Sequence, residues 1–130
     1  MEPQIYLLDL WSKEYRQFTL AEFLSRCECR PGWHQVITEL CEKLWELGWD
    51  GRVKQCKEKF GLLRFYPDNY TDEMYRLIDH YQERSGEFCE LCGAFPASLH
   101  MDRGWVSTRC DDCYSEELAK LARASKNYTI

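Results

Sequence analysis

The sequence predicts an α+β fold, and three observations carry that prediction. Residues 52–66 have the pattern of two short strands joined by a tight turn. Apolar residues recur at three- and four-residue steps over residues 33–47 and 70–81, which is typical of amphipathic helices. Two Cys-x-x-Cys pairs are separated by the 17 residues 93–109. Together these patterns predict a basic β-hairpin or small antiparallel sheet packed by amphipathic helices, with a four-cysteine zinc ribbon near the C-terminus.

The first thirty residues carry one clear helix signal. Residues 4–18 fit either two short strands or a packed extended arm, and their pattern does not decide between the two. Thr19-x-x-Glu22 is a capping box, which predicts a short helix that ends near Arg26. Pro31 and Gly32 interrupt any helix, so residues 27–32 are predicted to form a loop.

Three amphipathic helices are expected after this loop. The first ends at Gly48, and its predicted apolar face consists of Trp33, Val36, Ile37, Leu40, Leu44 and Leu47. The second ends at Ser85-Gly86, with an apolar face of Tyr70, Met74, Leu77, Ile78 and Tyr81. The last runs through Leu118, Leu121 and Ala122.

The predicted hairpin has strands over residues 53–58 and 62–66 and a three-residue turn, Lys59-Phe60-Gly61. Gly61 suits the positive φ that such a turn needs. Alternation places Leu63 and Phe65 on one face and Leu62, Arg64 and Tyr66 on the other.

The four cysteines of the two pairs are the predicted metal ligands: Cys89, Cys92, Cys110 and Cys113. Each pair presents two thiolates from a tight turn, and four sulfurs about 2.3 Å from one zinc ion complete a tetrahedron. Such a site has no open position for a substrate water, so we expect a structural role. The alternatives to a zinc site are two disulfides or four free thiols.

Length and composition predict one cooperative domain of 130 residues. Its parts are an α+β body over residues 1–86 and a zinc-ribbon lobe with the C-terminal helix over residues 87–130. The chain has no apolar run long enough to span a membrane, and its first residues do not resemble a secretion signal. Eight cysteines without such a signal favour a reducing compartment, so a cytoplasmic location is expected.

Charge is unevenly distributed along the chain. The formal net charge is −5, yet residues 51–66 hold five bases against Glu58 alone. The overall balance argues against general nucleic-acid affinity. The local excess predicts a ligand- or partner-binding surface made of Lys57, Lys59, Phe60, Arg64 and Tyr66. Alternatively, these bases form ion pairs with acids of the flanking helices, and binding then falls to a face with Trp45 and Trp49.

Several segments together resemble a family of small, uncharacterised bacterial and bacteriophage proteins. They are Gly32-Trp33 with Leu40-Cys41, Lys57-Glu58-Lys59-Phe60-Gly61-x-Leu63-Arg64-Phe65-Tyr66, Cys89-Glu90-x-Cys92-Gly93 and Gly104-Trp105-x-x-Thr108. The resemblance covers most of residues 32–113 and implies a prokaryotic or phage setting. It implies no particular reaction.

The favoured function is a non-enzymatic, zinc-stabilised binding protein, encoded by a phage and acting on a host protein. A nucleic-acid or nucleotide binder that uses the basic hairpin is the second hypothesis; a small anionic ligand fits the same residues. A metal-dependent nuclease built around His100-Met101-Asp102 is the third, and no catalytic residue is assigned. The remaining cysteines either form a second metal site with His34 or pack as small apolar residues; they are Cys27, Cys29, Cys41 and Cys56.

Overall fold

The computed structural model describes residues 5–11, 16–102 and 105–128. In chain order its elements are β1 (Tyr6–Asp9), β2 (Gln17–Thr19), α1 (Leu20–Arg26), a 3-10 turn (Pro31–Trp33), α2 (His34–Glu46), β3 (Arg52–Lys59), β4 (Leu62–Pro67), α3 (Asp72–Ser85), β5 (Ser98–Asp102), β6 (Trp105–Arg109) and α4 (Asp111–Tyr128). The mixed α+β class predicted from the sequence is therefore confirmed.

The main sheet has the strand order β2-β1-β3-β4. Strands β1 and β2 are antiparallel, as are β3 and β4, but β1 and β3 run parallel. The predicted hairpin is present as β3-β4, but the sheet that contains it is mixed and not antiparallel, because the chain passes through α1 and α2 before β3 and returns in the direction of β1. The second sheet, β5-β6, is a separate antiparallel hairpin.

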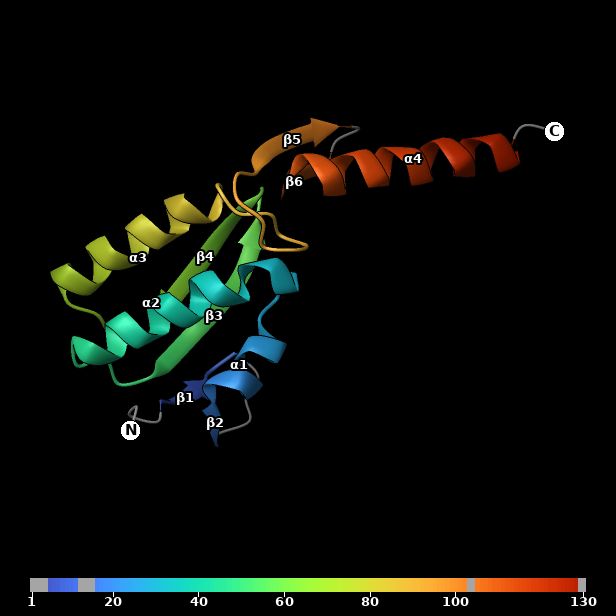
Figure 1. Ribbon diagram of the computed structural model, residues 1–130. Helices are drawn as coiled ribbons and strands as arrows, with labels where there is room; N and C mark the ends of the chain where they lie inside the picture. Colours follow the sequence, from blue (N-terminus) through green and yellow to red (C-terminus); the bar gives the residue numbers. More distant parts are fainter. Residues whose placement is uncertain (1–4, 12–15, 103–104, 129–130) are drawn as a thin grey trace.

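Helices α2 and α3 contact each other and lie across one face of the main sheet (Figure 1). The core between the layers contains Leu7, Leu40, Leu63 and Phe65, each at most 1% exposed. Successive residues along β4 alternate between buried and more exposed positions, so the predicted division of its two faces is confirmed. The face turned away from the helices is called the open face below.

Side chains of α3 pair with the outer edge of β4. The Leu63 N–H donates to Ser85 Oγ at 2.9 Å, and the Phe65 N–H donates to Gln82 Oε1 at 3.0 Å. An edge strand otherwise leaves such groups available for pairing with another chain. These two bonds anchor the C-terminal half of α3 against the hairpin.

The hairpin turn contains two residues, not the three predicted. Lys59 pairs with Leu62, which leaves Phe60 and Gly61 as the turn with φ of 53° and 81°. Two positive φ angles give a turn whose twist matches that of the strands. Glu58 Oε1 accepts the Gly61 N–H at 2.8 Å and stabilises this conformation.

The predicted helices are present with small changes. The capping box of α1 is confirmed, with Glu22 N–H donating to Thr19 Oγ1 at 3.2 Å. Leu47 and Tyr70 are exposed and lie just outside α2 and α3, so the predicted apolar faces were too long. Trp49 is 3% exposed and packs edge-on against Phe65, which rules out the alternative binding face that included it.

Helix α4 extends away from the body beyond the β5-β6 hairpin (Figure 1). Its first two turns are held by two contacts with that hairpin. The Tyr114 ring stacks on His100 with centroids 3.7 Å apart, and Glu117 pairs with Arg109 at 2.6 Å. None of the described helices is both long and apolar enough to cross a membrane.

Candidate metal centre and binding surface

The four predicted metal ligands converge. Cys89 and Cys92 lie on the loop after α3, Cys110 directly follows β6, and Cys113 is in the first turn of α4. Their ligand atoms lie within 4.8 Å of one another, and the Sγ atoms of Cys92 and Cys110 are 3.7 Å apart. Four cysteines so placed could hold a metal ion. In the described ranges they form the one group of three or more such ligands.

Backbone N–H groups surround the sulfurs. Desolvation raises the pKa of Cys89, but bonds from the N–H groups of Cys92, Cys110 and Leu91 outweigh it and lower that pKa to about 7. Desolvation and thiol neighbours instead raise the pKa of Cys113. The cluster thus favours a thiolate at Cys89 even before a cation is considered, which suits a metal ligand.

The cysteine loop is held directly against the body by Gly32. The Gly32 N–H donates to the Glu90 carbonyl at 2.7 Å, and a Cβ on Gly32 would overlap the backbone of Cys89 and Glu90. The neighbouring Trp33 is fully buried and its Nε1 donates to the Phe88 carbonyl at 3.0 Å. The Gly32-Trp33 segment is therefore the surface of the body on which the cysteine loop packs.

The hairpin tip is the second attachment between body and lobe. Thr108 Oγ1 donates to the Gly61 carbonyl at 2.6 Å, and a Cβ on Gly61 would overlap Leu99 Cδ1. The same Thr108 donates its N–H to Glu90 Oε2 at 2.6 Å. Gly61 is thus required both by its positive φ and by the close approach of β5 and β6.

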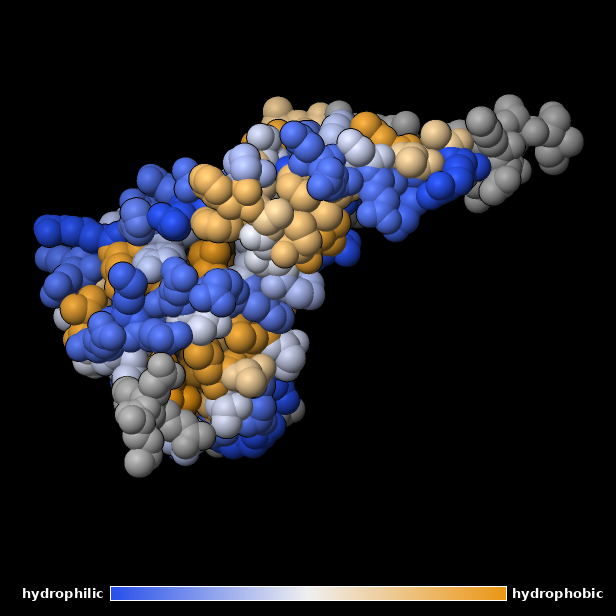
Figure 2. Space-filling view, in the orientation of Figure 1, coloured by the Kyte–Doolittle hydropathy of each residue, from blue (hydrophilic) through white to orange (hydrophobic). Residues whose placement is uncertain are grey.

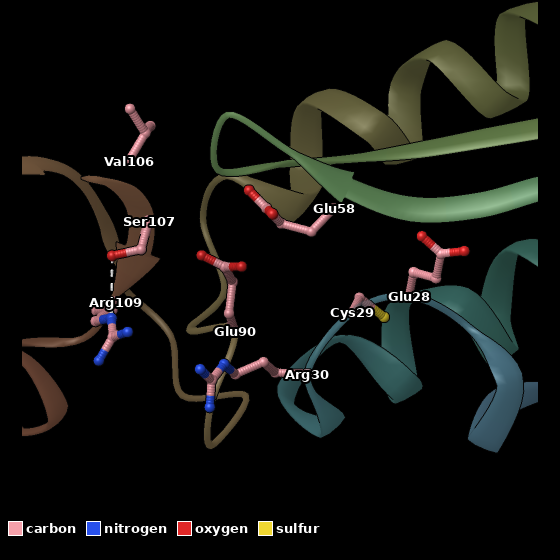
Figure 3. A pocket seen from close by; sticks show the side chains of 8 residues that line it. All are labelled: Glu28, Cys29, Arg30, Glu58, Glu90, Val106, Ser107 and Arg109. Carbon is pink, nitrogen blue, oxygen red and sulfur yellow. Dashed lines mark hydrogen bonds between the residues drawn. The ribbon is translucent and has the colours of Figure 1, made fainter. Parts of the chain in front are cut away.

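A polar cavity of about 240 Å³ lies between these two attachments (Figure 3). The carboxylates of Glu58 and Glu90 both point into it, and burial, with Glu58 nearby, raises the pKa of Glu90. Glu58 and Glu90 accept backbone bonds, and Arg109 pairs with Glu117 and Ser107. Glu58, Glu90 and Arg109 are thus already bonded within the protein. We therefore interpret the cavity as part of the polar interface between the body and the lobe. Sequence reasoning missed this role of Glu58 and Glu90, which no motif indicates.

The predicted binding residues lie along the hairpin. Lys57 is directly opposite Arg64, and Lys59 is opposite Leu62, so the three cations share the open face. Tyr66 lies two residues from Arg64 on the same face and is 43% exposed. Phe60 is at the tip, 69% exposed, with Lys59 Nζ 5.8 Å from its ring centroid.

Three cations of the hairpin have no ion-pair partner among the described residues, whereas Lys54 lies 4.0 Å from Asp68. Lys57, Lys59 and Arg64 make no ion pair with any residue that the structure describes. The exposed Glu28 forms a backbone bridge beside Lys57 but does not pair with it. The alternative in which these bases pair with acids of the flanking helices is therefore wrong for the described residues.

Two further residues join this surface that sequence reasoning missed. Leu8 pairs with Arg52, which places Arg52 on the open face, and Tyr6 lies on the same side of β1 as Leu8. Tyr6 is 40% exposed. The alternation in Tyr6-Leu7-Leu8 indicates that Tyr6 and Leu8 share one face of a strand. It does not indicate which strand lies beside β1 in the sheet.

The other four cysteines belong to the core side of the body. Cys41 and Cys56 are buried, and Cys27 and Cys29 pack against the same core. Burial raises the pKa of Cys29 to about 12 and that of Cys41 well above its usual value. Within the described residues their ligand atoms do not converge as those of the metal centre do. These features favour packing as small apolar residues.

Comparison with protein-family models, curated proteins and solved structures gives no match. The resemblance to small bacterial and bacteriophage proteins stays a prediction.

Proposed function

We propose that the protein is a non-enzymatic, zinc-stabilised binding protein that holds an anionic macromolecule on the open face of its main sheet. The supporting observation is the separation of charge between two layers. Helices α2 and α3 carry seven carboxylates against three Lys or Arg residues, and their outward surfaces are largely hydrophilic (Figure 2). On the open face, the described residues of β1–β4 include no carboxylate, and the exposed Glu28, which bridges Lys57 beside β3, is an acid at its border.

We propose an anionic partner because Lys57 and Arg64 on the open face have no ion-pair partner among the described residues. Lys57 and Arg64 are direct cross-strand neighbours, and like charges in that arrangement repel each other. An anionic partner would remove the repulsion and would be attracted despite the net charge of −5, because the acidic helices lie on the other layer.

Zinc is the metal proposed for the cysteine cluster. A tetrahedron with metal–sulfur bonds of about 2.3 Å has edges of about 3.8 Å, close to the 3.7 Å between Cys92 and Cys110. Four sulfurs are also a ligand set for iron, and elemental analysis of the purified protein distinguishes the two metals. The ion would tie the loop on Gly32 to β6 and α4, a structural role.

An acidic host protein and a nucleic acid are both partner classes for this surface. The formal net charge of −5 favours a protein partner over a nucleic acid. A phage setting would place that protein in a bacterial host. The exposed rings of Tyr6 and Tyr66 favour the nucleic acid, because bases stack on such rings.

Retention on immobilised heparin, a generic polyanion, tests the binding face. We expect retention of the unmodified protein and its loss when Lys57→Glu and Arg64→Glu are combined. The matched control combines Lys43→Glu and Arg76→Glu, which change the net charge equally on the exposed surface of α2 and α3. Equal retention of both double variants, or no retention of the unmodified protein, would overturn the proposal.

A further inference from the structure

A groove runs between the edge strand β4 and helix α3, at the border of the open face. It encloses about 380 Å³, in the range of about 300–1,000 Å³ that is typical of small-molecule sites. Phe65 and Ile78 contribute its apolar lining. The rings of Tyr66, Tyr70 and Tyr75 also line it and are 43%, 57% and 58% exposed.

The three tyrosines form an aromatic wall that the protein itself leaves uncovered. The rings of Tyr70 and Tyr75 are 6.1 Å apart between centroids and inclined by 30°. Each of the three tyrosines exposes more than two fifths of its surface beside apolar residues. This arrangement suits a ligand whose planar ring stacks on the tyrosine rings.

Polar groups with complementary roles line the same groove. Arg64 lies in its lining and has no ion-pair partner among the described residues. Gln82 uses its Oε1 to accept the Phe65 N–H, which leaves its side-chain NH₂ group as a donor. Asp79 supplies an acceptor. The donor and the acceptor suit hydrogen bonds to the edge of a nucleobase. The tyrosine rings suit stacking on its flat face.

We propose that this groove takes a base of a single-stranded nucleic acid whose phosphates lie along Arg64 and Lys57. The inference rests on the proposed function, since it uses the same cations. Arg64 belongs to both the groove and the open face, and Lys57 is its cross-strand neighbour, so phosphate and base sites are continuous. Poly-glutamate, which has no ring to stack, would contact the cations but leave the three tyrosine rings exposed.

Fluorescence anisotropy with a labelled single-stranded DNA of about 12 nucleotides tests the proposal. The same RNA sequence and labelled poly-glutamate serve as comparison probes. We expect log K to fall with log salt concentration with a slope of about −1.4, for phosphate contacts at Arg64 and Lys57. Tyr75→Ala and Arg64→Glu should each weaken oligonucleotide binding by about tenfold or more. Tyr75→Phe should retain the affinity, and Arg76→Glu, on the same helix, should change it less than Arg64→Glu.

The outcomes separate the groove from the wider binding face. If Arg64→Glu weakens oligonucleotide binding but Tyr75→Ala and Tyr66→Ala do not, the base site is refuted and the anionic surface stands. Binding of poly-glutamate without any binding of the oligonucleotides refutes the nucleic-acid inference alone. Failure to bind any of the three probes overturns both proposals. Melting curves and metal content of each variant establish that the fold is intact.

Discussion

Replacing Gly32 by alanine should separate the cysteine loop, which carries Cys89 and Cys92, from the body. An added Cβ would overlap the carbonyl oxygen of Cys89 and the backbone of Glu90, and backbone atoms cannot move aside as a flexible side chain would. Overpacking of this kind costs about 1–3 kcal/mol. Loss of the Gly32 N–H bond to the Glu90 carbonyl adds about 0.5–1.5 kcal/mol. We therefore expect Gly32→Ala to lower the free energy of unfolding by about 2–4 kcal/mol.

Thermal melting and metal transfer to a chromogenic chelator measure the two consequences. For a chain of this length, the loss corresponds to a melting temperature lower by about 6–20 °C. Metal should also leave Gly32→Ala faster, because its loop is no longer held. Gly48→Ala is the control: Gly48 has a φ of 92° with nothing within 4 Å of an added Cβ. That variant should lose stability through backbone strain alone and keep its metal. A Gly32→Ala protein that melts within about 1 °C of the parent would refute the reasoning.

Three other substitutions have defined expectations. Cys113→Ser should lose the metal and much of the cooperative melt, since metal binding is coupled to folding; elemental analysis that still finds one zinc per chain contradicts this. Phe60→Asn should raise the free energy of unfolding by about 0.5–1 kcal/mol, because asparagine tolerates the positive φ of this turn. An unchanged or lower stability would show that the Phe60 ring itself stabilises the fold. Ser85→Ala should cost about 1–3 kcal/mol in urea unfolding by leaving the buried Leu63 N–H without a partner, and parental stability would mean that this N–H finds another acceptor.

Local patterns in the sequence predicted most of the elements and the four cysteines that converge. The Thr19-Glu22 capping box forms because both partners lie within one helical turn. Alternation in β4 separates Leu63 and Phe65 from Arg64 because successive side chains of a strand point to opposite faces. The paired cysteine spacing predicted which four cysteines form the cluster, because each pair spans a single turn.

Tertiary structure decided which of these elements meet. No local signal indicates that β3 lies parallel to β1, since that pairing depends on the path of α1 and α2 between them. The contact of the cysteine loop with Gly32 joins segments more than fifty residues apart, and glycine has no side chain that would indicate its neighbour. The groove likewise appears only when α3 packs on the edge of β4 and brings Tyr75 to Arg64. Such contacts depend on which apolar faces bury each other, which is a property of the whole chain.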